Sequence, residues 1–204
     1  VSDVGCYGDS VGSAIVTIVE SSGNLNYTWT DSTGTDLGVN DSTITNLPAG
    51  KYNVTVEDLN KDTSLTESVI IDQPEPVELT LTSATTDTLT CNGDANGVID
   101  LEVSGGTTSY SYDWSNDSTS QDITKLTAGS YSVTVTDANG CSNDTSKTIY
   151  QPEPLEPNVS IDSEPSCYGE NDGVLISDPN GGNGGPFSFQ WNDPANQTTQ
   201  TADG

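Results

Sequence analysis

One motif recurs three times along this chain, and it constrains the fold more than any other feature. Each copy opens with a cysteine, a glycine two residues later and then an acidic residue, and a second glycine falls six residues after the cysteine. Further on, an alternating aromatic or apolar run ends in tryptophan. The copies begin 85 and 76 residues apart, which predicts a tandem array of small domains. The motif cysteines are Cys6, Cys91 and Cys167, the second glycines are Gly12, Gly97 and Gly173, and the tryptophans are Trp29, Trp114 and Trp191.

A second motif gives the boundaries of the array. Two copies carry Leu-x-Ala-Gly-x-Tyr-x-Val-x-Val and are followed by Gln-Pro-Glu-Pro. Proline favours extended polyproline geometry, so each Gln-Pro-Glu-Pro is expected to be a semi-stiff arm, unless direct packing between domains makes the joint rigid. The predicted organisation is a first repeat without its first strand at 1–72, a linker at 73–76, a complete repeat at 77–150, a linker at 151–154 and an incomplete repeat at 155–204.

Apolar residues of the complete repeat alternate with polar ones, which is the period of a β-strand. About seven short strands separated by turn signals indicate an all-β chain of tandem immunoglobulin-like or PKD-like antiparallel β-sandwich domains. The aromatic residues are expected to anchor the cores, with a sugar-stacking platform as the alternative. The strands are expected at 77–81, 98–103, 110–114, near Ile123, at 131–136 and at 145–150. The expected core anchors are Trp29, Trp114, Trp191, Tyr52 and Tyr131.

The charge of the chain argues against several classes of partner. There are 31 acidic residues and four lysines, with no arginine and no histidine, for a formal net charge of −27. Such a chain repels nucleic acids and anionic lipids, and no apolar stretch approaches the roughly 20 residues that span a membrane. Without histidine or arginine, most nucleophilic, zinc and phosphate chemistries lack their usual residues. We therefore predict no enzyme activity, no nucleic-acid partner and no membrane insertion.

The complete repeat holds two cysteines. Cys91 opens its second strand region and Cys141 follows an Asn-Gly turn, so both could lie at one end of the sandwich. A disulfide between Cys91 and Cys141 would close about fifty residues and stabilise the fold by roughly 4 kcal/mol on the chain-entropy model. This predicted pairing indicates an oxidising, extracellular compartment. It leaves Cys6 without a partner in its own repeat, where Lys61 and Asp62 stand at the position of Cys141.

These motifs resemble the SprB-type repeat of large Bacteroidota surface adhesins, including the gliding-motility adhesin. The resemblance implies immunoglobulin-like or PKD-like sandwiches, export through the type IX secretion route and display on the cell surface. The first repeat departs from the pattern because it lacks the second cysteine, and the third departs from it by an enlarged loop at 178–186. The residues that carry the resemblance are the runs from Cys91 to Gly106, from Tyr110 to Asn116 and from Leu126 to Cys141, followed by Gln151-Pro152.

Acidic loops rich in asparagine and glycine offer the oxygen ligands that Ca²⁺ prefers. The full EF-hand spacing is absent, and such loops are more often solvated turns, so calcium is the one cofactor that the sequence leaves open. The calcium candidates are Asp94, Asn96, Asp137 and Asp172.

Glycan attachment is a further expectation. Asp-Ser or Asp-Thr followed by a small or aliphatic residue resembles the O-glycosylation signal of Bacteroidota, and Asn-x-Ser/Thr triplets are N-glycosylation acceptors. In a chain so rich in these residues, many matches are accidental. The O-glycosylation candidates are Ser10, Ser32, Ser42, Thr88 and Ser118, and triplets begin at Asn26, Asn53, Asn143 and Asn158.

Three functions are compatible with these features. The leading hypothesis is a structural segment, stalk or filament, of a large exported adhesin at the cell surface, which spaces a distal adhesive tip from the cell and whose partners are the neighbouring repeats of the same chain. A second is a module that binds surface polysaccharide through exposed aromatic rings or the glycine-rich loop at 181–185. The third is a protomer of an extracellular polymer in which the next chain donates a strand to the last repeat. A segment of a longer array accounts for the incomplete repeats better than strand donation does, and we expect that the chain is such a segment.

Overall fold

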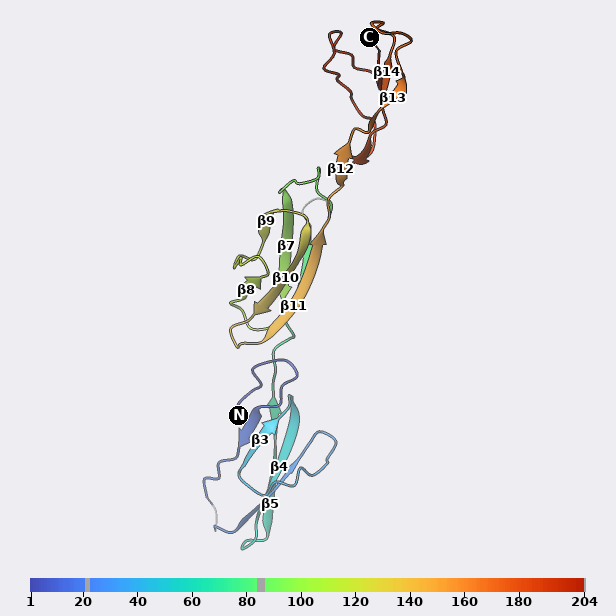
Figure 1. Cartoon of the computed structure of the whole chain (residues 1–204). Coiled ribbons are helices and arrows are strands. Elements are labelled where there is room, and N and C mark those ends of the chain that lie inside the picture. The colour runs from blue at the N-terminus through green and yellow to red at the C-terminus, as the bar shows by residue number, and fades with distance from the viewer. Residues whose placement is uncertain (21–22, 84–86, 204) are drawn as a thin grey trace. The chain divides into compact units, whose positions relative to one another are not determined.

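The computed structural model of the chain describes residues 1–20, 23–83 and 87–203. Throughout these residues the chain consists of strands, turns and loops without a helix, so the predicted all-β class is confirmed (Figure 1). Accordingly, this part of the chain holds no helix able to cross a membrane. The strands are β1 (Gly12–Ile15), β2 (Leu25–Thr30), β3 (Thr43–Leu47), β4 (Gly50–Asp58), β5 (Thr63–Ile71), β6 (Glu78–Thr82), β7 (Gly97–Ser104), β8 (Ser111–Trp114), β9 (Ile123–Leu126), β10 (Gly129–Thr136), β11 (Ser142–Ile149), β12 (Glu153–Glu156), β13 (Val159–Ser163), β14 (Val174–Ser177), β15 (Asn180–Gly182) and β16 (Thr201–Asp203).

The chain forms two compact units, and the boundary between them runs through the second repeat. Each unit therefore contains one junction between repeats, which is described within that unit below. The first unit comprises Val1–Thr80, Glu102–Thr119 and Val133–Thr145, and the second comprises Leu81–Leu101, Ser120–Ser132 and Ser146–Gly204.

The first repeat is a sandwich of two antiparallel sheets. β1 pairs with β3, and β4 lies between β2 and β5. Trp29 on β2 is only 1% exposed, and its indole N–H donates to the carbonyl oxygen of Asp41 at 2.8 Å. Burying a ring of this size stabilises the sandwich by about 3 kcal/mol. The buried residues of this core are Val4, Ala14, Trp29, Ile44, Leu47, Tyr52, Val54 and Ile71.

A close approach of two strands explains the glycine that follows the first two motif cysteines by six residues. Gly12 lies opposite Leu47 and Gly97 lies opposite Leu126, and the strand register shifts at both places. A Cβ atom on Gly12 would lie 2.8 Å from the carbonyl oxygen of Leu47, and one on Gly97 would lie 3.0 Å from that of Leu126. Because a side chain would push the strands apart, this glycine fixes their pairing in both repeats.

A tyrosine lies two residues after the glycine that begins β4 and β10. The hydroxyl of Tyr52 donates to the carbonyl oxygen of Pro48 at 2.9 Å, and that of Tyr131 donates to the carbonyl oxygen of Thr127 at 3.0 Å. Hydrogen bonds from a tyrosine back to the corner that precedes it are typical of immunoglobulin-like sandwiches. The first two repeats therefore share the tyrosine corner of that fold.

The second repeat contains two three-stranded sheets, in the orders β6-β7-β9 and β11-β10-β8. Its six strands overlap the six segments predicted from the alternation of apolar residues. Trp114 on β8 is 1% exposed, and the inward residues of β7 and β10 are equally buried. Those residues are Ile99, Leu101, Val133 and Val135.

The third repeat is the least covered of the three. Its sheets are β12-β15 and β13-β14-β16, and among its described residues no strands correspond to β10 and β11. Trp191 therefore remains partly exposed, although its indole N–H donates to the carbonyl oxygen of Thr199 at 2.9 Å. Of the three tryptophans expected to be core anchors, Trp29 and Trp114 are fully buried and Trp191 is only partly buried. Val159 and Ile161 of β13 are also more than half exposed.

Candidate functional site at the repeat junctions

The first linker is held on both sides by backbone and side-chain hydrogen bonds. The amide of Gly8, in the loop of the motif cysteine, donates to the side-chain oxygen of Gln73 at 2.8 Å. From the second repeat, the amide of Gly106 donates to the carbonyl oxygen of Glu75 at 2.8 Å. The first linker is therefore packed between the two repeats and is not a free, semi-stiff arm.

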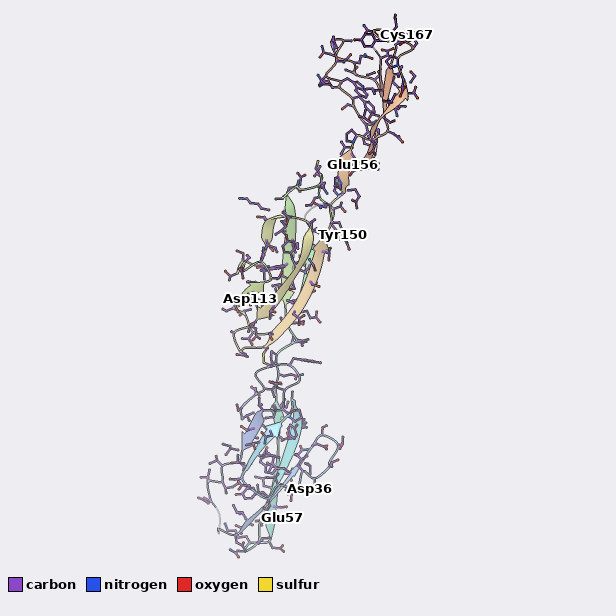
Figure 2. All side chains as sticks on the ribbon, viewed as in Figure 1. Asp36, Glu57, Asp113, Tyr150, Glu156 and Cys167 are labelled. Carbon is purple, nitrogen blue, oxygen red and sulfur yellow. A yellow bond between two sulfur atoms is a disulfide. The ribbon has the colours of Figure 1, made fainter. Side chains whose placement is uncertain are left out.

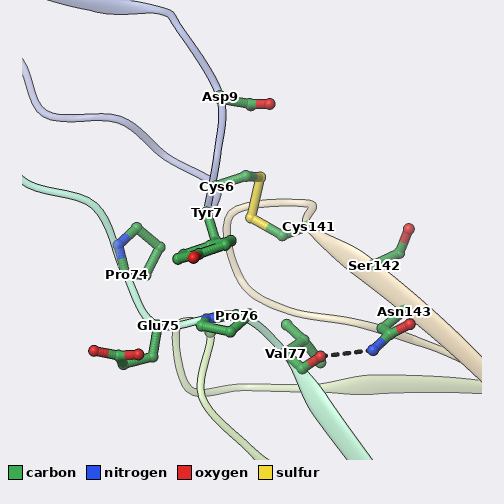
Figure 3. A pocket seen from close by; sticks show the side chains of 11 residues that line it. Cys6, Tyr7, Asp9, Pro74, Glu75, Pro76, Val77, Cys141, Ser142 and Asn143 are labelled. Atoms are coloured by element: carbon green, nitrogen blue, oxygen red, sulfur yellow. Dashed lines mark hydrogen bonds between the residues drawn. A yellow bond between two sulfur atoms is a disulfide. The ribbon is translucent and has the colours of Figure 1, made fainter. Parts of the chain in front are cut away.

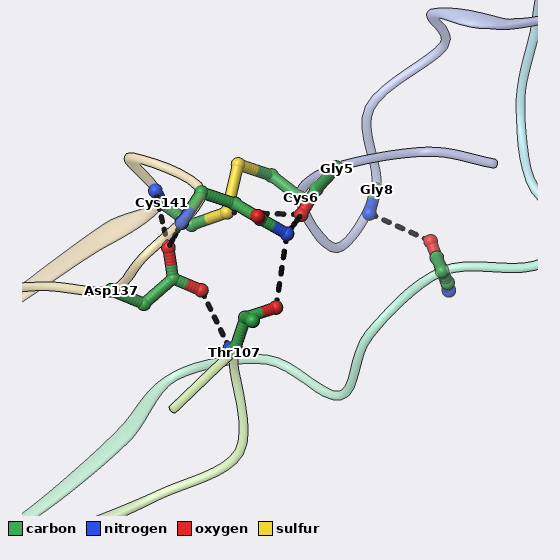
Figure 4. The surroundings of a disulfide bond; sticks show 8 residues. Gly5, Cys6, Gly8, Thr107, Asp137 and Cys141 are labelled. Atoms are coloured by element: carbon green, nitrogen blue, oxygen red, sulfur yellow. Dashed lines mark hydrogen bonds between the residues drawn. A yellow bond between two sulfur atoms is a disulfide. The ribbon is translucent and has the colours of Figure 1, made fainter. Parts of the chain in front are cut away.

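A disulfide joins the first repeat to the second at this linker. Cys6 is bonded to Cys141 with a Cα–Cα distance of 5.5 Å, and 135 residues separate the two in sequence (Figure 4). The predicted pairing of Cys91 with Cys141 is therefore wrong, although the indication of an oxidising compartment remains. Cys91 is a free, exposed thiol.

The length of β11 explains the wrong pairing. Cys141 immediately precedes β11, whereas the loop of Cys91 is bonded to the residues that follow this strand, since the amide of Gly93 donates to the side chain of Gln151 at 2.9 Å. A strand of eight residues spans about 26 Å. A disulfide needs Cα atoms within about 7 Å of each other, so Cys91 and Cys141 cannot bond within one repeat.

Asp137 organises the turn that carries Cys141. One carboxylate oxygen accepts the amide of Thr107 at 2.8 Å, and the other accepts the amides of Asn139 and Cys141, both at 2.9 Å (Figure 4). The hydrogen bond from Thr107, followed by that from Cys141, lowers the pKa of Asp137 against the opposing effect of burial. The carboxylate thus fixes the turn against the Gly105-Gly106 loop.

Two adjacent glycines bring the second repeat against the linker. Gly105 and Gly106 both have positive φ, 71° and 60°, as a type I′ turn requires. A Cβ atom on Gly105 would lie 1.8 Å from the carbonyl oxygen of Pro76, a distance that no side chain tolerates. The contact with the linker therefore depends on the absence of a side chain at Gly105.

The second junction repeats this arrangement in the second unit. Gly93 donates to Gln151 as Gly8 donates to Gln73. Gly181 has a φ of 77°, and a Cβ atom on it would lie 1.9 Å from the carbonyl oxygen of Pro154. The linker here even becomes a strand, because β12 pairs with β15.

An asparagine side chain crosses each junction to the same backbone position. The amide of Asn139 donates to the carbonyl oxygen of Gly5 at 2.9 Å, and that of Asn183 donates to the carbonyl oxygen of Thr90 at 2.5 Å. Gly5 and Thr90 each directly precede a motif cysteine. Both cysteine loops are thus bound by the repeat that follows them.

An open pocket of about 380 Å³ lies beside the disulfide of the first junction (Figure 3). Pro74 and Pro76 line it together with Tyr7, whose side chain is 56% exposed. On its far side the amide of Asn143 donates to the carbonyl oxygen of Val77 at 2.7 Å. The lining carries the carboxylates of Asp9 and Glu75, which make this open groove acidic.

The calcium candidates do not gather into one site. Asp94 and Asn96 lie together, since the amide of Asn96 contacts a carboxylate oxygen of Asp94 at 3.4 Å. The carboxylates of Asp137 and Asp172 are instead occupied by backbone amides, that of Ser166 in the case of Asp172. In residues 1–20, 23–83 and 87–203, no group of three or more acidic, cysteine or histidine residues could hold a metal ion.

The glycosylation candidates lie on loops and strands with differing exposure. Ser10, Ser32 and Thr88 are exposed, and Ser42 and Ser118 are half-buried. Three of the asparagine candidates donate a hydrogen bond from the side-chain amide to another part of the chain, although Asn143 and Asn158 are exposed. Asn26 donates to Glu57, Asn143 to Val77 and Asn158 to Asp178.

The junction residues were missed as a group by sequence reasoning. The glycine pairs Gly105-Gly106 and Gly181-Gly182 occur before the tryptophan run of two repeats. Each pair occurs in the repeat that follows a Gln-Pro-Glu-Pro motif, and this recurrence is the signal that could have indicated a contact between the glycines and the linker. Asn139 and Asn183 gave no such signal, because they occupy different positions in their repeats.

The family model of the SprB repeat matches residues 82–119 and 161–196, which lie in the second and third repeats. The resemblance drawn from the motifs is therefore confirmed. No curated protein matches the chain.

Several solved structures are similar to the chain in fold. The three N-terminal domains of the Hoc outer capsid protein of bacteriophage RB49 match with 19% identity and a TM-score of 0.44, over 86% of this chain and 65% of that one. The titin I-band fragment I67–I69 matches with 12% identity and a TM-score of 0.45, over 98% of this chain and 84% of the fragment. The amphioxus IgVJ-C2 molecule matches with 16% identity and a TM-score of 0.34, over 74% of this chain and 99% of its own. The chain thus spans less than two thirds of the Hoc structure.

Proposed function

We propose that this chain, in which two segments are SprB repeats, is a load-bearing stretch of the stalk of a large exported adhesin, which spaces a distal adhesive tip from the cell surface. The observation that carries the proposal is the disulfide between Cys6 and Cys141, because it joins successive repeats rather than closing one of them. A protein that only displays independent binding domains does not need neighbouring domains to be joined covalently, whereas in a protein under tension such a bond gives the load a second path.

The bond changes the path that a pulling force follows. Load applied near the N-terminus passes from Cys6 directly to Cys141, so the residues between them are not stretched. Those residues include the strands β1 to β5 of the first sandwich and the strands β6 to β10 of the second repeat. Cell-surface display agrees with the oxidised cysteines and with the acidic, self-repelling composition.

Single-molecule pulling tests this proposal. The chain is tethered through its two ends and stretched with and without a reductant. Because 135 residues are bypassed, we expect the oxidised chain to be shorter at full extension by about 450–490 Å than the reduced chain. A Cys6→Ser variant should match the reduced chain under both conditions. Equal extension of the oxidised and reduced wild-type chains would contradict a load-bearing role for the bond.

Location is tested separately. An antibody raised against the folded chain should label intact, unpermeabilised cells of the source organism. Labelling that appears only after permeabilisation would contradict display at the surface.

A further inference from the structure

Each junction is crossed by an asparagine that a glycine follows directly. Asn139 precedes Gly140, and Asn183 precedes Gly184. The side-chain amide of each asparagine donates to the carbonyl oxygen of the residue before a motif cysteine. Both glycines have positive φ and open space around them. An Asn-Gly pair therefore supplies the hydrogen bond between repeats in both units.

Asn-Gly is also the pair in which asparagine most readily loses its side-chain amide, because glycine has no side chain to hinder its own backbone nitrogen. That nitrogen gives up its proton and attacks Cγ of the asparagine. A C–N bond forms and closes a succinimide, the bond from Cγ to Nδ2 breaks, and ammonia leaves with the proton. One water molecule then opens the ring to aspartate or isoaspartate, so the reaction needs no oxidant and no enzyme.

We propose that Asn139 and Asn183 are deamidation sites, each protected while its junction is closed and reactive when that junction opens. These sites go beyond the proposed function, because they react in the same way in a protein that bears no load.

The closed first junction restrains both reacting groups. The amide of Asn139 donates to the carbonyl oxygen of Gly5 and to the hydroxyl oxygen of Thr107, both at 2.9 Å (Figure 4). The nitrogen that attacks is also engaged, since the N–H of Gly140 donates to the carbonyl oxygen of Asp137 at 3.1 Å. Ring closure turns the side chain toward this nitrogen and removes its proton, which breaks these hydrogen bonds. The reaction therefore proceeds from the locally opened junction.

The second junction protects its asparagine less. Tyr150 and Glu156 flank the second linker (Figure 2). There the carbonyl oxygen of Thr90 accepts the amide of Asn183 at 2.5 Å. The cysteine of the same loop, Cys91, is a free thiol, so it adds no covalent bond to this contact. We expect this junction to open more often and Asn183 to react before Asn139.

Deamidation makes the opening permanent, because it replaces a hydrogen-bond donor with an acceptor. The amide of Asn139 faces two oxygen atoms, whereas a carboxylate donates to neither and is repelled by both. The added charge also lies two residues from the carboxylate of Asp137, in a chain whose net charge is already −27. The product cannot remake the contact, and each reaction weakens its junction.

Peptide mapping of the full chain in a mildly alkaline buffer measures the deamidation rate at each asparagine. The same measurement in urea gives the rate without protection. We expect Asn139 to react at least about tenfold more slowly in the folded, oxidised chain than in urea, and Asn183 to be protected less. Isoaspartate among the products identifies the succinimide route. Equal rates at Asn139 in the folded and unfolded chains, or stronger protection of Asn183, would overturn the proposal.

Opening the first junction separates protection from intrinsic reactivity. Removal of the disulfide in a Cys6→Ser/Cys141→Ser variant should accelerate deamidation of Asn139 at least about tenfold. Reduction of the wild-type chain gives the same test if the variant does not fold. Asn183 is the internal control, because its junction belongs to the other unit and its rate should not change. The proposal is wrong if Asn139 keeps its rate without the disulfide.

Aspartate variants reproduce the product of the reaction. Asn139→Asp should accelerate hydrogen exchange of the Gly8 amide, and Asn183→Asp that of the Gly93 amide, each about fivefold. Asn116→Asp is the control, because it adds the same charge on the exposed loop that follows β8 and should leave both exchange rates unchanged. If neither junction variant exchanges faster than this control, deamidation does not weaken the junctions.

Discussion

The first and second junctions share a set of backbone contacts and differ in their covalent bond. Each has a glutamine that accepts a loop amide, a glycine that meets a proline carbonyl and an asparagine that reaches the residue before the motif cysteine. The first adds a disulfide and the Asp137 turn. The shared contacts already define the joint in both units, which indicates that the disulfide reinforces a geometry that glycine and glutamine establish.

The largest expected difference between the junctions comes from removing the disulfide. A loop of 135 residues gives about 5 kcal/mol on the chain-entropy model, so we expect the Cys6→Ser/Cys141→Ser double variant to lose up to that amount of unfolding free energy. The matched control, Cys91→Ser/Cys167→Ser, removes the two free thiols and should change stability by less than about 0.5 kcal/mol. The unfolding free energies of both variants are measured by urea unfolding without reductant and compared. Equal losses would show that the bond adds nothing to the first junction.

Substituting the linker-facing glycines should affect both junctions alike. Gly105→Ala and Gly181→Ala each place a methyl group within 2 Å of a carbonyl oxygen, and we expect each to lose about 3 kcal/mol. Gly140→Ala and Gly184→Ala are the matched controls, since both glycines have positive φ but open space around them. These controls should lose only about 1 kcal/mol, the strain of a left-handed alanine. Thermal unfolding distinguishes the two pairs, and a loss no larger in Gly181→Ala than in Gly184→Ala would refute the common contact.

Acid should weaken the first junction selectively. The pKa of Asp137 is lowered in the folded chain, so its stabilising effect is complete above the ordinary carboxyl pKa of 3.8 and is lost as the pH falls through the folded value. Hydrogen exchange at the amides of Thr107 and Cys141 should accelerate below about pH 4. The second junction should not show this effect through Asn183, because the side-chain amide of Asn183 does not ionise. In an Asp137→Asn variant this part of the pH dependence should disappear. Identical profiles for the variant and the wild-type chain would assign the effect to other carboxylates.

The smallest expected effect is that of the linker glutamines. Gln73→Ala and Gln151→Ala each remove one exposed hydrogen bond, and each should destabilise its junction by about 0.5–1 kcal/mol. Because the first junction keeps its disulfide, the population of open second junctions should rise more. Exchange of the Gly8 and Gly93 amides measures this. If amide exchange accelerates more at Gly8 than at Gly93, the first junction is not the more stable of the two.

The strands could be predicted because their evidence is local. Alternation with period two identified β7 and β10, and the tryptophan runs identified β2 and β8. The disulfide could not be predicted by the same means, because Cys91 and Cys141 share a repeat but lie at opposite ends of β11. The true partner of Cys141 belongs to a different copy of the motif, 135 residues away. The exposure of Trp191 was also beyond local pattern, since it depends on which strands cover the ring.

The bond between residues 6 and 141 also governs what happens when the chain is cut. A protease that cleaves anywhere between them, including at the tip of an exposed turn, leaves two pieces that are still one molecule until the sulfurs are reduced. A single nick in the first sandwich would therefore not detach whatever lies further along the protein. If the chain is the extracellular stalk proposed above, where hydrolytic enzymes are abundant and damaged proteins cannot be resynthesised in place, that tolerance would keep a severed stalk attached.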